Sequence, residues 1–252
     1  MASQAPCIFS DTRRVQRRKR MLAVGDSARF VLEDMIEDVL ERLAFIRLEP
    51  ARSLIIGDVT SALAAQLSGE VVGADIFGSD CLDLSVPYLV GEFDFIAVLG
   101  LLDTINDLPG ALVHLRHALA PGGRVIASFP GAGSLPNLRA AMLAAEPDRT
   151  AARMHPLVDA RAGAQLLQRA GWSDPVVDTH DLVARYSTLD RLVHDLREQG
   201  LGNVLASPSP PIGKAALERA RRVFLDRADP DGKVSETFSI LTLSGRRSLA
   251  GT

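Results

Sequence analysis

Four short, continuously apolar segments alternate with segments of helical pattern along the first half of the chain, and this alternation most constrains the fold. The apolar segments span residues 53–57, 70–76, 93–99 and 124–129. Strands of a parallel sheet are buried on both faces, so they lack the polar–apolar alternation of a half-exposed strand. Strands that alternate with helices favour parallel pairing. The sequence therefore predicts an α/β fold, with a mostly parallel sheet covered on both faces.

Segments of helical pattern flank these strands. Residues 28–47 carry an apolar stripe opposite an acidic face, which is typical of a surface helix. A helix over 108–120 follows Asn106 or Asp107 and has Pro109 at an early position. The small residues 60–67 predict a helix after the first strand. The C-terminal half predicts helices over 159–170, 188–199 and 214–228 and strands over 176–183 and 237–243.

Length and composition indicate one globular unit. The chain has 252 residues, 47% hydrophobic and 23% charged, and shows no internal repeat or low-complexity linker. We expect a helical N-terminal extension over 1–50, a main domain over 51–247 with a helical insertion at about 134–230, and a tail over 248–252.

Several protein classes are disfavoured. A net charge of −3 makes no case for a nucleic-acid binder. The longest apolar runs, near residues 93–102, are about half of the roughly 20 residues that a transmembrane segment needs. Cys7 and Cys81 form neither a CxxC pair nor a disulfide framework. These features predict a cytoplasmic protein without a transmembrane segment.

The first twenty residues are strongly basic. They hold six lysine and arginine side chains against the single acid Asp11. Such an arm can contact an anionic surface or an acidic partner. A solvated helix face, or an arm lying on the body of the protein, is the simpler interpretation.

The turns after the first two strands are where a doubly wound sheet binds a nucleotide-like ligand. After the first strand only Gly57 is a glycine, and Val59 and Ser61 stand where further glycines are expected. The second strand ends at Asp75, about twenty residues past that turn, a spacing that suits either a ribose ligand or a helix cap.

Together these features resemble a known family. The succession of Gly57, Asp75, 93–96, 106–109 and 119–123 resembles the class I S-adenosylmethionine (SAM)-dependent methyltransferases.

A closer resemblance, over nearly the whole chain, is to one branch of that family. The branch holds the malonyl-carrier-protein methyltransferase of biotin synthesis and the complex I assembly factor that acts on an arginine. This similarity lies in residues 8–11, 17–20, 166–172, 195–197 and 238–245. Because the basic arm matches the start of the family's domain, we expect it to belong to the folded unit.

The resemblance implies a doubly wound, seven-stranded sheet, SAM as the cofactor, and a protein or small-molecule acceptor. A complex I subunit is the protein substrate or partner that it suggests. Carried over to this chain, it assigns the methionine-binding turn to Gly57 and Asp58 and the ribose hydroxyls to Asp75. It places Asp83 near the adenine and Leu99 in the wall of the site. It identifies no catalytic residue and no metal ligand.

The chain departs from the family pattern at the cofactor motif. Ile55 stands where the family has an acid, Val59 and Ser61 interrupt the glycine-rich turn, and Asp103-Thr104 replaces a His-Trp pair. A β-branched residue such as Val59 cannot adopt a positive φ without strain. Two functions therefore stay open. The chain is either a SAM-dependent methyltransferase or related arginine hydroxylase, or a non-catalytic assembly or interaction protein that has lost the cofactor.

Other candidate sites are weaker. His114 and His117 lie three apart in a predicted helix, but no cysteine or acid at ligand spacing completes a zinc site. Trp172 and Tyr186 are the aromatic residues best suited to line a pocket, although core packing is the simpler interpretation. The Gly-x-Gly-x-x-Gly signature of a nucleotide-dependent oxidoreductase is absent at the first turn.

Overall fold

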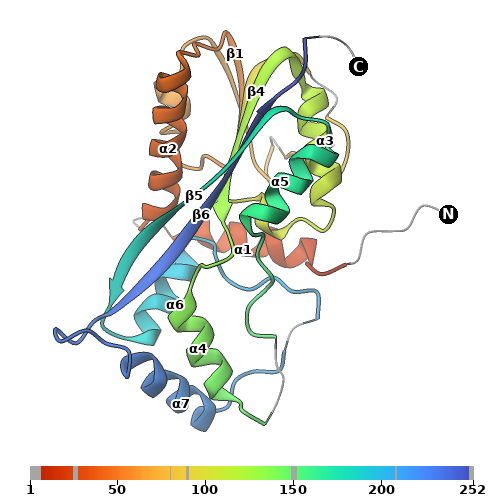
Figure 1. The fold of residues 1–252 in the computed structure, drawn as a ribbon. Coiled ribbons are helices and arrows are strands. Elements are labelled where there is room, and N and C mark those ends of the chain that lie inside the picture. The colour runs from red at the N-terminus through yellow and green to blue at the C-terminus, as the bar shows by residue number, and fades with distance from the viewer. Residues whose placement is uncertain are drawn as a thin grey trace.

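A single six-stranded sheet organises the computed structural model, which describes residues 7–24, 28–79, 81–88, 91–148, 152–207 and 209–249 (Figure 1). The strands lie in the order β2-β1-β3-β4-β6-β5. Their bounds are β1 Arg52–Ile56, β2 Glu70–Ala74, β3 Phe93–Leu99, β4 Leu119–Pro130, β5 Ser173–Tyr186 and β6 Val234–Arg246. The first four pair in parallel, whereas β6 runs antiparallel to both β4 and β5. The predicted α/β class with a mostly parallel sheet is confirmed.

The expected count of seven strands is wrong for the described residues, which form six. After β2 the chain makes one isolated parallel bridge, between Asp75 and Cys81. A local turn follows at once, in which the Asp83 carboxylate accepts a hydrogen bond from the Ser85 N–H at 2.8 Å. A side chain that satisfies nearby backbone donors in this way competes with strand pairing. The additional strand is thus reduced to a bridge, and β2 forms one edge of the sheet.

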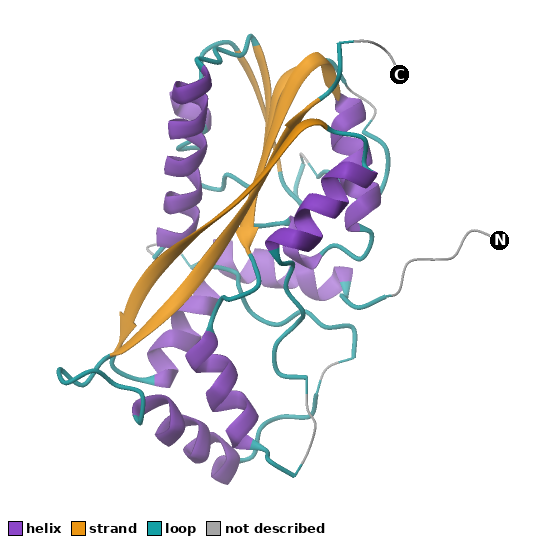
Figure 2. Cartoon of the chain, in the orientation of Figure 1, coloured by secondary structure: helices purple, strands orange, loops and turns teal. Residues whose placement is uncertain are grey.

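Helices cover both faces of the sheet (Figure 2). Their bounds are α1 Asp11–Ala23, α2 Phe30–Ile46, α3 Leu108–Ala118, α4 Pro136–Ala145, α5 Ala160–Arg169, α6 Leu189–Glu198 and α7 Lys214–Leu225. One apolar core joins α2, α4, α6 and α7 to the sheet, and a second core lies under α3 and α5 on the opposite face. In the described part of the chain, no helix is long and apolar enough to cross a membrane.

The helix expected over residues 60–67 is replaced by a turn and a short 3-10 helix, η1 (Ala64–Gln66). Asp58 explains the change, because its carboxylate accepts hydrogen bonds from the N–H groups of Thr60, Leu63 and Ala64 at 2.9–3.2 Å. These bonds satisfy donors that a helix would otherwise use. The positive φ of this turn falls on Ser61, at 58°, so Val59 avoids the strained region.

The lost helix leaves part of the sheet uncovered. A hollow of about 370 Å³ lies beside β1 and β2 and is lined in part by Ile55, Asp58, Val59, Asp75 and Phe77. It therefore includes two of the residues that the sequence assigns to the cofactor.

Gly57 holds β1 against β3 in a conformation that only glycine adopts readily. Its φ is +93°, and a Cβ there would lie 2.4 Å from the Leu99 carbonyl oxygen and 3.1 Å from Leu101 Cδ1. We expect Gly57→Ala to lower the free energy of unfolding by at least about 2 kcal/mol, because backbone strain and steric overlap add together. Urea denaturation measures the change.

Gly73→Ala is the matched control, because it lies in neighbouring β2 and a Cβ there meets nothing within 4 Å. It should leave stability within about 0.5 kcal/mol of the wild type. Equal effects of the two substitutions would contradict the close approach at Gly57.

Candidate functional site

Three arginines of α1 are buried at the carboxyl edge of the sheet. The basic arm forms this helix, which begins after Ser10, whose hydroxyl accepts a hydrogen bond from the Arg13 N–H at 3.3 Å. Arg14, Arg17 and Arg18 share one face of it and are only 7–8% exposed. Figure 1 shows α1 crossing the lower end of the parallel strands. The arm is therefore part of the folded unit.

Arg18 joins the ends of β1 and β2. Its guanidinium Nε lies 3.1 Å from both carboxylate oxygens of Asp75, and Nη2 lies 2.7 Å from Oδ2. The same Nη2 donates to the carbonyl oxygen of Gly57 at 2.7 Å. Planar, two-point pairing of this kind is the strong form of an arginine–carboxylate contact. Arg18 thus occupies the Asp75 carboxylate, which the family resemblance assigns to the ribose hydroxyls of the cofactor, and the carbonyl oxygen of Gly57.

Arg14 and Arg17 fix the neighbouring part of α1. Arg14 donates to Thr104 Oγ1 at 3.3 Å and to the Leu101 carbonyl oxygen at 3.4 Å. Arg17 donates to Thr104 Oγ1 at 3.5 Å and to the Gly202 carbonyl oxygen at 2.8 Å. Burial lowers the pKa of Arg17 from its ordinary value. The helix is thereby tied to the segment after β3 and to the loop after α6.

Little space remains between α1 and the strand ends. The cavity beside Arg17, Arg18, Met21, Leu99 and Gly100 measures about 30 Å³. Pockets that hold a small molecule or cofactor usually measure roughly 300–1,000 Å³. α1 thus closes one side of Asp75, whereas the hollow of about 370 Å³ that is lined by Asp58, Val59 and Asp75 stays open.

The other predicted cofactor residues are divided between the edge and separate loops. Gly57, Asp75 and Leu99 lie together around α1, with the Leu99 side chain fully buried in the core. Asp58 serves the turn after β1, where it also accepts from Thr60 Oγ1 at 2.8 Å. Asp83 is exposed and caps its own turn. Of the five predicted residues, Asp58 and Asp75 share the open hollow beside β1 and β2, whereas Gly57, Asp83 and Leu99 do not line it.

The weaker candidate sites were two aromatic residues and a pair of histidines on α3. Trp172 and Tyr186 are 6% and 3% exposed and pack in the two cores, as the simpler interpretation expected. His114 is half-buried and His117 is exposed. Across the described ranges, no group of three or more histidine, cysteine or acidic side chains is arranged to hold a metal ion.

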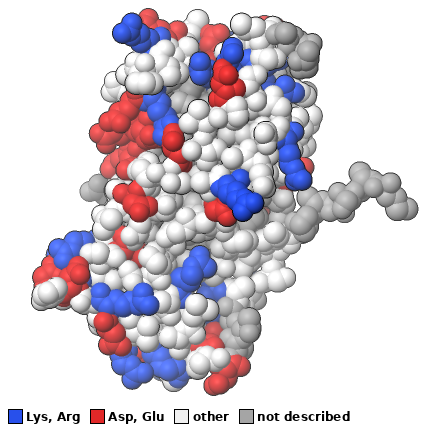
Figure 3. Space-filling model, viewed as in Figure 1, with Lys and Arg blue, Asp and Glu red and all other residues white. Residues whose placement is uncertain are grey.

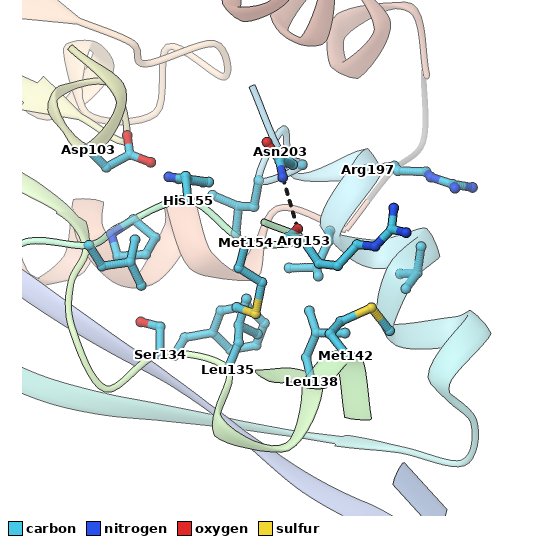
Figure 4. Close-up of a pocket in the computed structure, with 17 residues that line it drawn as sticks. Asp103, Ser134, Leu135, Leu138, Met142, Arg153, Met154, His155, Arg197 and Asn203 are labelled. Atoms are coloured by element: carbon cyan, nitrogen blue, oxygen red, sulfur yellow. Dashed lines mark hydrogen bonds between the residues drawn. The ribbon is translucent and has the colours of Figure 1, made fainter. Parts of the chain in front are cut away.

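A larger pocket, which the sequence did not reveal, lies between α4, α6 and the carboxyl end of β4 (Figure 4). It has a volume of about 260 Å³. Its walls are mostly apolar and include Leu135, Leu138, Met142, Met154 and Leu196. We call it the Asp103 pocket. The one sequence signal that pointed here was Asp103-Thr104, in place of the family's His-Trp pair.

Two polar groups stand at one end of this pocket, where Figure 4 shows Asp103 and His155 facing each other. Asp103 is 6% exposed, and its buried Oδ1 has no hydrogen-bond partner among the described residues; nor has His155 Nδ1. Burial lowers the pKa of His155, whose ring meets Phe9 edge-on at 5.6 Å between centroids. A buried acceptor without a partner is costly. Arg153 and Arg197 also line the pocket, and Asp103 interacts electrostatically with Arg17. The pocket therefore suits a ligand that carries a hydrogen-bond donor on an apolar stem.

Comparisons with known proteins agree with this fold. The methyltransferase domain family matches residues 26–175, more than half of the chain. The malonyl-[acyl-carrier protein] O-methyltransferase of Halorhodospira halophila is 27% identical over 243 residues, which cover 86% of this chain and 81% of that protein. The mitochondrial arginine hydroxylase NDUFAF5 of Danio rerio is 25% identical over 228 residues, which cover 89% of this chain and 67% of that protein.

A solved structure shows the same fold at low sequence identity. The YcgJ protein of Bacillus subtilis superposes with a TM-score of 0.54 at 12% identity, covering 86% of this chain and 99% of that one. The matched domain, the curated relatives and the sheet together establish the family. The chain belongs to the class I SAM-dependent methyltransferases, in the branch that holds the malonyl-carrier-protein methyltransferases and the mitochondrial arginine hydroxylases.

Proposed function

We propose that this chain is a non-catalytic member of its family, an assembly or interaction protein that does not bind SAM and receives an arginine side chain of a protein partner in the Asp103 pocket. The proposal that the chain does not bind SAM rests on the pairing of Arg18 with Asp75. The side chains of this pair are 10% and 19% exposed, so the pair is largely withdrawn from solvent. A cofactor that displaced Arg18 from Asp75 would leave the guanidinium buried without its counter-ion, which is strongly unfavourable.

The lining of the Asp103 pocket supports the proposal that it receives an arginine side chain. The three methylenes of an arginine match its apolar walls, and a guanidinium supplies the donors that Asp103 Oδ1 lacks. One curated relative carries the name of an arginine hydroxylase, which makes arginine the first side chain to test. By the same family analogy, a subunit of respiratory complex I is the partner we propose. Methyl transfer from SAM to an acceptor is the competing function.

Isothermal titration calorimetry distinguishes these functions directly. We expect no saturable heat when millimolar SAM is titrated into the wild-type protein, because Arg18 holds the Asp75 carboxylate that the ribose of SAM would need. Saturable one-to-one binding that Asp75→Asn abolishes would overturn the proposal in favour of the enzyme.

A double-mutant cycle tests whether Asp75 serves α1. Arg18→Met and Asp75→Asn should each lower the free energy of unfolding by roughly 2–4 kcal/mol, because each leaves a buried partner unpaired. The double variant should lose less than the sum, with a coupling above about 1 kcal/mol. Arg20→Met, an exposed position of the same helix, is the control. Single variants as stable as this control would show that Arg18 does not hold the edge closed.

Peptide binding tests the Asp103 pocket. A fluorescein-labelled nonapeptide with a central arginine should bind, and its citrulline counterpart, which is neutral and of similar shape, should bind at least about tenfold more weakly. Asp103→Asn should weaken the arginine peptide by a similar factor, whereas Asp83→Asn, an exposed acid, should not. Failure of the arginine peptide to bind, or equal affinity for the two peptides, would contradict the assignment.

A further inference from the structure

Another hollow lies between the C-terminal half of α2 and the sheet, toward the opposite end of β4 from the Asp103 pocket. It measures about 510 Å³. Its walls come from the C-terminal half of α2 and from β4, β5 and β6. We call it the α2–β5 groove.

Ion pairs hold the two walls of the groove at a fixed separation. Arg42 Nε lies 2.9 Å from the Asp38 carboxylate on α2, and its Nη1 lies 2.6 Å from Asp178 Oδ2 on β5. A second contact joins the residue one helical turn before Asp38 to the residue two positions after Asp178. There, His180 Nε2 lies 2.7 Å from Asp34 Oδ2. Asp38 also accepts a hydrogen bond from Thr242 Oγ1 at 3.0 Å, which anchors the network to β6. The groove is therefore a built feature of the fold.

Apolar side chains line the mouth of the groove in contact with solvent. Phe45 is 89% exposed at the end of α2, Val176 is 47% exposed on β5, and Ile46 is 39% exposed. An aromatic ring left this open beside a hollow is typical of a surface that binds a partner. The side chains that anchor such interfaces are aromatic or aliphatic groups that enter a pocket.

The negative charge beside the groove lies on α2. Of the four acids that line the groove, Asp38 and Asp178 pair with Arg42 and Asp174 pairs with Arg246, whereas Glu41 takes part in none of these pairs. Glu33 and Glu37 extend the acidic face of α2 beyond it. Figure 3 shows acidic side chains gathered over α2 on this face of the molecule. An acidic rim around an apolar centre attracts a partner of opposite charge and favours its orientation.

We propose that the α2–β5 groove docks a basic segment of a protein partner, in which an aromatic or aliphatic anchor is flanked by lysine or arginine. The anchor packs between Phe45 and Val176, and the flanking cations lie against Glu41 and Glu37 on the exposed face of α2. The proposal does not depend on the Asp103 pocket, since different residues line the two sites.

Fluorescence anisotropy with three labelled peptides of equal length tests the proposal. The first carries Leu-Phe-Leu flanked by lysines, the second replaces Leu-Phe-Leu by serines, and the third replaces the lysines by glutamates. We expect the first peptide to bind the wild type at least about tenfold more tightly than either of the others, because anchor and charge both contribute.

Two surface variants locate the binding. Phe45→Ser should weaken the first peptide by at least about tenfold. Leu143→Ser is the matched control, because Leu143 is 71% exposed on α4, outside the groove. Glu41→Lys should also weaken binding, and added salt should reduce the wild-type affinity.

Three results would overturn the proposal. They are no binding of the first peptide, equal binding of the serine peptide, and an affinity that Phe45→Ser leaves unchanged. A wild-type dimer that Phe45→Ser dissociates in sedimentation velocity would place a second copy of the chain in the groove instead.

Discussion

The arrangement of the sheet edge depends on one buried ion pair, between Arg18 and Asp75. Withdrawing two charges from water is costly, and the pair persists only where further hydrogen bonds satisfy its remaining donors. The Gly57 carbonyl oxygen supplies that bond at 2.7 Å. One guanidinium therefore joins the helix to the ends of β1 and β2. Once Arg18 is placed, the helical spacing carries Arg14 and Arg17 to the ends of β3 and α6, where backbone carbonyls and Thr104 receive them.

The parallel strands were predictable because burial on both faces leaves a continuous apolar run, and β3 was predicted at its observed bounds, Phe93–Leu99. The turn after β1 was not, because the pattern of small residues contains no sign of the hydrogen bonds that Asp58 makes within the turn. Asp75 was found at a strand end, but its partner lies 57 residues earlier. Periodicity carries no information about such a pairing. The Asp103 pocket was missed for the same reason, since its walls come from separate segments.

The fold tolerates these changes because its stability lies elsewhere. Two apolar cores, one on each face of the sheet, involve the strands and helices but not the carboxyl groups at the edge. A family fold therefore persists when its cofactor motif changes, and function follows the site and not the architecture. In this chain the departures from the family pattern are the interrupted glycine turn and the helix lost after β1.

The sequence separations of the α1 contacts bear on the order in which the chain folds. Arg18 pairs across 57 residues, Arg14 meets Thr104 across 90, and Arg17 meets Gly202 across 185. During synthesis on the ribosome, α1 is made early, but the Gly202 carbonyl oxygen that Arg17 contacts is made only after most of the chain. Contacts of such long range form late and pay the largest loop-closure entropy. We therefore expect α1 to be among the last elements to dock. Until it docks, Arg14, Arg17 and Arg18, which are buried in the folded protein, are exposed to water.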